Sequence, residues 1–130
     1  MHIYAPYQYP APELFEHFQL SPDRHVAITA RYHRNVDDRD LVMQIPVTAD
    51  APLRDDPDGA LLIDVWSDDE ERDWLASTVF VMNEDQARLE RISIFGDWQS
   101  RGLFALMIIV AQELMGWSRT LSGLDQAEVW

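Results

Sequence analysis

The chain has 130 residues, no cysteine, and 23 acidic against 10 basic residues, which gives a formal net charge of −13. This length allows one domain, and 47% hydrophobic residues exclude a disordered acidic tail. The lack of cysteine excludes disulfides, thiolate metal sites and a cysteine nucleophile. The negative charge argues against direct binding to nucleic acid or to an anionic membrane. We therefore expect a single acidic domain over residues 1–130.

The sequence carries no signal that would place the chain in or across a membrane. Residues 1–12 have neither a basic segment nor an apolar segment of the kind found in secretory signals. The longest apolar run, Leu103–Ala111, is shorter than the roughly 18 residues that a membrane-spanning helix needs. A cytoplasmic location is therefore the expectation.

The first segments of the chain predict an extended stretch followed by a short helix. Residues 1–10 contain three tyrosines and two prolines, and the prolines favour an extended path. In residues 11–23, Leu14, Phe15 and Phe18 follow a near-helical spacing, and a Ser-Pro pair ends the pattern. We therefore predict a short amphipathic helix in residues 11–23.

The middle of the chain predicts strands. From residue 25 the apolar residues alternate with a period of two, as in a half-buried strand. Turn sequences rich in Asp, Asn, Pro and Gly separate several such segments. The predicted strands are residues 25–33, 41–49, 60–66, 74–82 and 87–95.

The last strong pattern predicts a helix from about Ser100 to Met115, with Gly116 as its C-terminal stop. Eleven of the thirteen residues from Leu103 to Met115 are apolar. Residues 118–130 hold a short strand or simply pack on the domain. The order of elements predicts an α+β fold: an antiparallel sheet of about five strands, a short N-terminal helix, and one long, strongly apolar C-terminal helix on one face.

Negative charge is concentrated between Asp37 and Asp73, where thirteen acidic residues stand against three arginines, a local net charge of −10. Like charges repel, so their concentration costs folding free energy and creates a strong surface potential. One interpretation is a solvated, solubilising face. The other is a surface for a basic partner, including a protein that natively binds nucleic acid, with carboxylates in the place of phosphates. The candidate partner-binding residues are Asp55, Asp56, Asp58, Asp68, Asp69, Glu70, Glu71 and Asp73.

The predicted C-terminal helix is apolar on every side and must be covered on every side. The sheet, the N-terminal helix and the C-terminal tail together are one possible cover. A second subunit that meets residues 103–114 through a two-fold contact is the other.

The segment RISIFGDWQSRGLFALMIIVAQELMG, residues 91–116, resembles the central strand, phosphate loop and helix of the acetyl-CoA-dependent N-acetyltransferase superfamily. That loop reads Gln or Arg, two residues, Gly, one residue, then Gly or Ala, and the matching positions are Gln99, Gly102 and Phe104. The resemblance implies that backbone N–H groups at the helix start hold a pyrophosphate. It also implies cofactor contacts at Gln99, Arg101 and Gly102, with the acyl-CoA beside the strand Arg91–Phe95.

Other catalytic patterns are absent from the sequence. The four histidines lack metal-ligand spacing, and no G-x-S-x-G sequence occurs. We therefore expect neither a metal nor a cofactor. The leading hypothesis is a non-enzymatic interaction protein of the inhibitor, immunity or antidefence type, a nucleic-acid mimic whose acidic loops occupy a basic surface. The alternative is an N-acetyltransferase-like domain, active or decayed.

Overall fold

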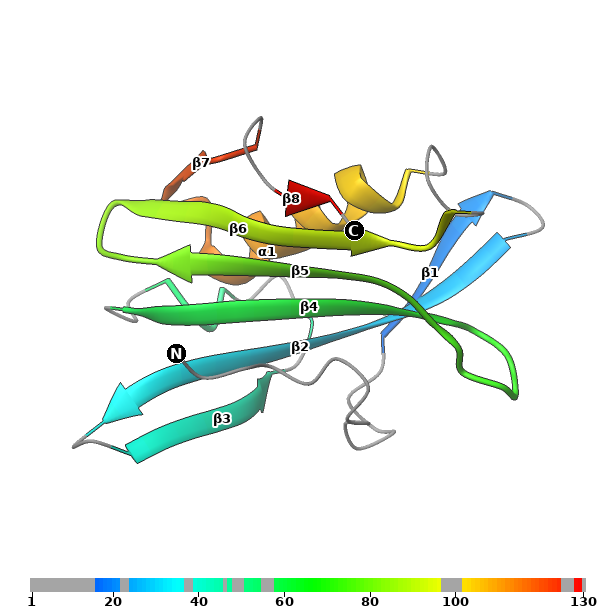
Figure 1. Ribbon diagram of the computed structural model, residues 1–130, viewed down its shortest axis with the longest axis horizontal. Coiled ribbons are helices and arrows are strands. Elements are labelled where there is room, and N and C mark those ends of the chain that lie inside the picture. The colour runs from blue at the N-terminus through cyan, green and yellow to red at the C-terminus, as the bar shows by residue number, and fades with distance from the viewer. Residues whose placement is uncertain are drawn as a thin grey trace.

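The computed structural model describes residues 16–21, 24–36, 39–45, 47, 51–54, 58–96, 102–124 and 128–129. Its strands form one sheet of order β1-β2-β4-β5-β6-β7, in which β3 also pairs with β2 and β8 with β6 (Figure 1). The elements are β1 (Glu16–Ser21), β2 (Arg24–Val36), β3 (Arg39–Ile45), β4 (Gly59–Ser67), β5 (Trp74–Met82), β6 (Gln86–Ile94), α1 (Leu103–Met115), β7 (Thr120–Ser122) and β8 (Glu128–Val129).

The α+β class predicted from the sequence is confirmed, and the five predicted strands correspond to β2 through β6. The sheet is mixed, however, because β7 and β8 both pair with β6 in parallel. The antiparallel prediction therefore holds for β1 to β6 only. The helix α1 connects β6 to β7, because two parallel strands that pair need a long crossover connection between them.

The prediction of an N-terminal helix is wrong for residues 16–21, which form β1. This strand makes an antiparallel hairpin with β2, in which Phe18 lies opposite Val26. Phe18 and Leu20 are two residues apart, so the same apolar pattern fits a strand as well as a helix. Residues 16–21 form a strand because the backbone edge of β2 offers them hydrogen-bonding partners. Residues 11–15 and the predicted extended segment 1–10 lie outside the described residues.

The main hydrophobic core lies between one face of the sheet and α1, which Figure 1 shows behind β5 and β6. Alternate residues of β4, from Leu61 through Ile63 to Val65, point to this side and are fully buried. Met107 and Leu114 of α1 are also fully buried there. Each such side chain contributes about 1.5–3 kcal/mol. None of the described residues belongs to a helix long and apolar enough to cross a membrane.

The ends of α1 are set by two glycines. Gly102 precedes the helix with φ 84°, so the helix starts at Leu103 and not at Ser100, which lies outside the described residues. Gly116 follows it with φ 66°, and backbone N–H groups at this end donate to the carbonyls of Gln112 and Glu113. The prediction of Gly116 as the helix stop is therefore confirmed.

We expect Gly116→Ala to destabilise the fold by about 1–2 kcal/mol, because an L side chain is strained at this left-handed φ. A Cβ at this position would also lie 2.5 Å from Arg54 Nε and 2.8 Å from Ala51 Cβ. Urea unfolding monitored by circular dichroism measures the change. Gly96→Ala is the control: Gly96 has no heavy atom within 4 Å of the added Cβ and no left-handed φ, so equal losses would contradict the prediction.

Candidate functional site

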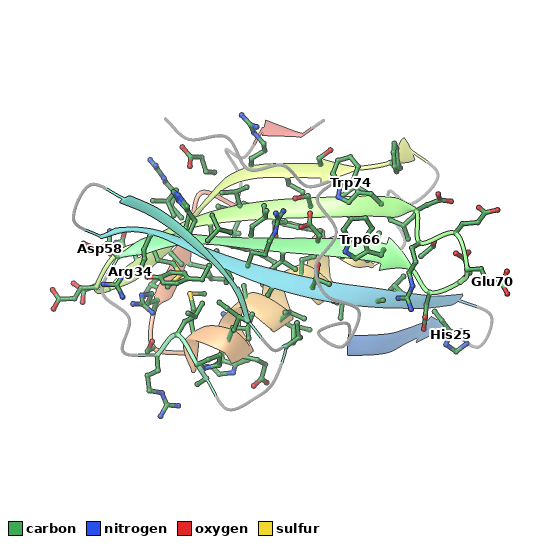
Figure 2. All side chains as sticks on the ribbon, turned by 90° about the horizontal axis from the view of Figure 1, so that it is seen from below. His25, Arg34, Asp58, Trp66, Glu70 and Trp74 are labelled. Atoms are coloured by element: carbon green, nitrogen blue, oxygen red, sulfur yellow. The ribbon has the colours of Figure 1, made fainter. Side chains whose placement is uncertain are left out.

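The structure divides the predicted acidic surface between two ends of the sheet. Asp58 comes directly before β4 and Asp68 directly after it. A nine-residue strand is roughly 30 Å long, and Figure 2 shows Asp58 and Glu70 at opposite ends of the molecule. Asp55 and Asp56 lie outside the described residues. The predicted carboxylates therefore do not form one continuous surface.

The larger group of carboxylates lies in residues 68–73, which we call the acidic loop. Its conformation is held by hydrogen bonds to the Asp69 carboxylate from the Ser67 hydroxyl (2.8 Å) and from the backbone N–H groups of Glu71 (3.0 Å) and Arg72 (3.1 Å). The Ser67 hydroxyl in turn accepts a hydrogen bond from the N–H of Asp73 at 2.8 Å. Arg72 adopts a left-handed φ of 53°. The loop is therefore closed by its own side chains.

The carboxylates of the acidic loop have two different roles. The hydrogen bond from the Ser67 hydroxyl, followed by that from the Arg72 N–H, lowers the pKa of Asp69, so this side chain stays ionised and holds the loop. Glu70, Glu71 and Asp73 are exposed, while Asp68 is half-buried. Figure 2 shows Glu70 projecting from the end of the sheet. The loop thus presents several carboxylates from an ordered backbone.

An aromatic pair lies at the base of the acidic loop. Trp74 follows the loop directly, and its ring meets that of Phe95 edge to face, with centroids 5.5 Å apart and an angle of 69° between the planes. The Phe95 N–H donates to the carbonyl of Leu75 at 3.0 Å, which fixes the backbone of the pair. Phe95 is 54% exposed, so this apolar side chain is accessible to a partner.

A second acidic region lies at the other end of the sheet. The turn between β5 and β6, with Asn83, Glu84, Asp85 and Gln86, lines a hollow of about 550 Å³ together with Asp58. The Asn83 side chain accepts hydrogen bonds from the N–H groups of Asp85 (3.1 Å) and Gln86 (2.9 Å) and so holds the turn. Across the described ranges, no group of three or more His, Cys, Asp or Glu residues is placed to hold a metal ion.

A buried ion pair lies on the sheet face opposite α1, and sequence reasoning did not identify it. Arg31 Nη2 of β2 donates to Asp64 Oδ2 of β4 at 3.1 Å, and the two residues are 6% and 1% exposed. Thr29 and Ser77 are the cross-strand neighbours of Asp64. Trp66 Nε1 donates to Thr29 Oγ1 at 3.0 Å. The centre of this face is thus polar, although it is buried.

Burial raises the pKa of Asp64 to about 6, and the nearby Arg31 guanidinium opposes this rise without cancelling it. One signal in the sequence could have identified Asp64. It is an acid inside the otherwise apolar run ALLIDVW, and a buried carboxylate requires a partner. The identity of that partner depends on the register between β2 and β4, which the sequence pattern does not give.

The segment that resembles an acetyltransferase loop is described only in part, because Gln99 and Arg101 lie outside the described residues. Gly102 stands at the start of α1, where no side chain from the described residues caps the helix. The crossover from β6 through α1 to the parallel strand β7 agrees with the expected strand and helix order. However, β8 pairs with β6 at Arg91 and Ile92. The strand edge where the resemblance expects an acyl-CoA is therefore already paired at these two residues.

The outer side of α1 is not fully covered by the chain. Phe104 is 36% exposed and Ile109 is 51% exposed, whereas Leu106 and Ile108 are half-buried. Trp117, just beyond the helix, is 59% exposed. Residues 16–21, which were expected to belong to a helix that covers α1, form β1 of the sheet instead.

No protein-family model, no curated protein and no solved structure matches this chain. The acidic loop, the hollow beside Asp58 and the Arg31–Asp64 pair are therefore judged on their own geometry and charge.

We expect Asp64→Asn to flatten the pH dependence of stability between about pH 4 and pH 6. The pKa of Asp64 rises from 3.8 to about 6 on folding, so in this range the folded state binds more protons than the unfolded state. The free energy of unfolding of the wild type therefore falls as the pH rises, by about 3 kcal/mol from this group. Urea unfolding across the pH range measures the difference between the two proteins.

Asp69→Asn is the control of opposite sign, because folding lowers the pKa of Asp69. Its stabilising contribution is present above the unfolded pKa and is lost as the pH falls. The stability gap between wild type and Asp69→Asn should thus stay nearly constant between pH 4 and pH 6 and narrow as the pH falls below the unfolded value of 3.8. Parallel pH profiles for the wild type and Asp64→Asn would contradict the assignment.

Proposed function

We propose that this chain is a non-enzymatic interaction protein that presents the acidic loop to a basic surface of a partner protein. The observation that carries this proposal is the set of three hydrogen bonds to Asp69, which order a loop rich in carboxylates before any partner binds. A preordered loop loses less conformational entropy on binding than a mobile one. The chain would act as an inhibitor, or as an immunity-type or antidefence-type factor.

The aromatic pair at the base of the loop supports an arginine-bearing partner surface. An Arg guanidinium pairs with a carboxylate through a planar fork and also stacks on aromatic rings. The loop offers carboxylates, and Phe95 and Trp74 offer rings directly beside them. Proteins that natively bind nucleic acid present such arginines, so the chain would compete for their binding surface. Electrostatic attraction of this kind speeds association and weakens with added salt.

The test compares two triple variants that remove the same charge from opposite ends of the sheet. Glu70→Gln, Glu71→Gln and Asp73→Asn neutralise the acidic loop but leave Asp69 to hold it. The matched control is Asp58→Asn, Glu84→Gln and Asp85→Asn, around the hollow. We expect a partner captured from the native host by the wild type to bind the loop variant at least tenfold more weakly, a loss of about 1.4 kcal/mol, and the control nearly normally.

Calorimetric titration of the purified partner gives both affinities. Equal losses in the two variants would show that only net charge matters, and unchanged binding of the loop variant would rule out the loop as the contact. The salt dependence of the wild-type affinity should be steeper than that of the loop variant.

The competing function is binding of acetyl-CoA at the start of α1, which the crossover from β6 to β7 favours. A ligand that prefers the folded state raises the melting temperature. The interaction proposal expects no shift with millimolar acetyl-CoA in differential scanning fluorimetry. A rise that grows with acetyl-CoA concentration would instead favour a cofactor site at Gly102.

Self-association through residues 103–114 is a subsidiary proposal, supported by the exposure of Phe104 and Ile109. These few partly exposed side chains offer less area than the roughly 800 Å² per partner of a standard stable interface. A contact through α1 would therefore be weak, or would include further residues.

A further inference from the structure

The two strands that carry the acidic loop meet at a pair of tryptophans. Trp66 of β4 lies opposite Trp74 of β5, and Figure 2 shows both side chains on the half of the sheet that ends in the loop. Just beyond them, the Ser67 N–H donates to the carbonyl of Asp73 at 2.8 Å. Trp66 is fully buried, and its indole N–H donates to Thr29. One side of the loop base is thus anchored, and the position of Trp74 sets the other.

A β-bulge in β5 determines the direction of the Trp74 side chain. The register shifts beside the Trp66–Trp74 pair, so that β5 holds an extra residue, Leu75, at this point. Leu75 and Ala76 both lie in the main core beneath α1. In a regular strand Trp74 would share that side with Ala76, because side chains alternate between the two faces. The bulge instead places Trp74 on the opposite face of the sheet, which is the face that holds Asp64.

On that face the indole N–H of Trp74 is close to the Asp64 carboxylate. Trp74 Nε1 and Asp64 Oδ1 are both buried, and neither atom makes a close hydrogen bond. Burial raises the pKa of Asp64, and the charge of Arg31, the Ser77 hydroxyl and the Trp74 indole oppose this rise. The interaction between Trp74 and Asp64 is therefore a long one. Its strength depends on the carboxylate charge, because hydrogen bonds to an ionised acceptor are about twice as strong as neutral ones.

The Trp74 contact is consequently linked to the proton on Asp64. A contact that lowers the pKa of a carboxyl is stronger with the ionised form, so ionisation in turn strengthens the contact. In the described part of the chain, Arg31 of β2 is the charged group bonded to Asp64. His33 of β2 and Arg91 of β6 lie farther along the same face of the sheet. Uptake of a proton by Asp64 therefore weakens its hold on the indole N–H.

We infer that Asp64 is a positioning residue for the acidic loop, because its carboxylate holds the Trp74 indole in place from within the sheet. Trp74 carries this constraint to the surface through its edge-to-face contact with Phe95, which is 54% exposed. The aromatic pair beside the loop is thus held most firmly when Asp64 is ionised, and it loosens as the pH falls below about 6. The consequence for partner binding rests on the proposed function, whereas the link between Asp64 and the aromatic pair is tested without a partner.

Two tryptophan variants test the link through the titration of Asp64 itself. Trp74→Phe removes the indole N–H beside the carboxylate but keeps a ring next to Phe95. Trp66→Phe is the matched control, because it removes the neighbouring indole N–H, which donates to Thr29. We expect the pKa of Asp64, measured by NMR of its carboxyl carbon, to rise in Trp74→Phe and to keep its wild-type value in Trp66→Phe. No rise in Trp74→Phe, or an equal rise in both variants, would overturn the inference.

A second measurement follows the surface in the wild-type chain and so does not depend on the folding of a variant. The nuclear Overhauser effect between the Trp74 and Phe95 rings should weaken as the pH falls from about 7 to about 5, across the pKa of Asp64. The indole signal of the exposed Trp117, beyond α1, should stay unchanged. A ring contact that keeps its full strength at the lower pH would overturn the inference.

Asp64→Asn separates this titration from that of other groups on the same face, such as His33. The asparagine carries no charge at either pH, so the contact between the Trp74 and Phe95 rings should be equally weak at both. If the ring contact in Asp64→Asn still weakened as the pH falls, another group would be responsible and the inference would be wrong.

Discussion

The burial of β4 on both of its faces is the constraint on which the rest of the structure depends. Leu61 and Ile63 point into the core beneath α1, whereas Leu62 and Trp66 point to the opposite side, and all four are nearly inaccessible to water. A strand buried in this way can hold a carboxylate only if a partner neutralises it. Asp64 therefore requires Arg31, and the pair links β4 to β2 through side chains as well as through the backbone ladder.

The same constraint explains where the accessible charge lies. Because the central strand offers no exposed side, the exposed acids that the structure describes in this region, Asp58 and those of the acidic loop, lie in the connections that flank it. One group gathers in the acidic loop and another around Asp58, about a strand length apart. The two groups also differ in what surrounds the carboxylates. In the acidic loop, Asp69 accepts three hydrogen bonds that hold the backbone, and the exposed ring of Phe95 lies beside the loop. A partner can therefore distinguish the two ends of a molecule that is negative at both.

The end of α1 could be predicted from the local sequence, whereas the cover of its outer side could not. Its apolar residues, followed by Gly116, predicted a helix that ends at Met115, because the left-handed stop is a local property. The covering of its outer side was not local. Residues 16–21, which were expected to help cover it, have an apolar spacing that fits both periods, and they pair with β2. The parallel pairing of β7 and β8 with β6 could not be predicted from the sequence either, because such short strands carry almost no periodic signal.

By itself, the sequence determined the α+β class, five strands, the apolar helix and the concentration of acids between Asp37 and Asp73. These features follow from local periodicity, turn residues and composition, which act over a few neighbouring residues. Only the tertiary structure decided that Asp58 and the acidic loop lie at opposite ends of the sheet, that Asp69 holds a loop, and that Asp64 pairs with Arg31. Strand register brings together residues 33 positions apart, and register depends on the packing of both sheet faces at once, which no local pattern encodes.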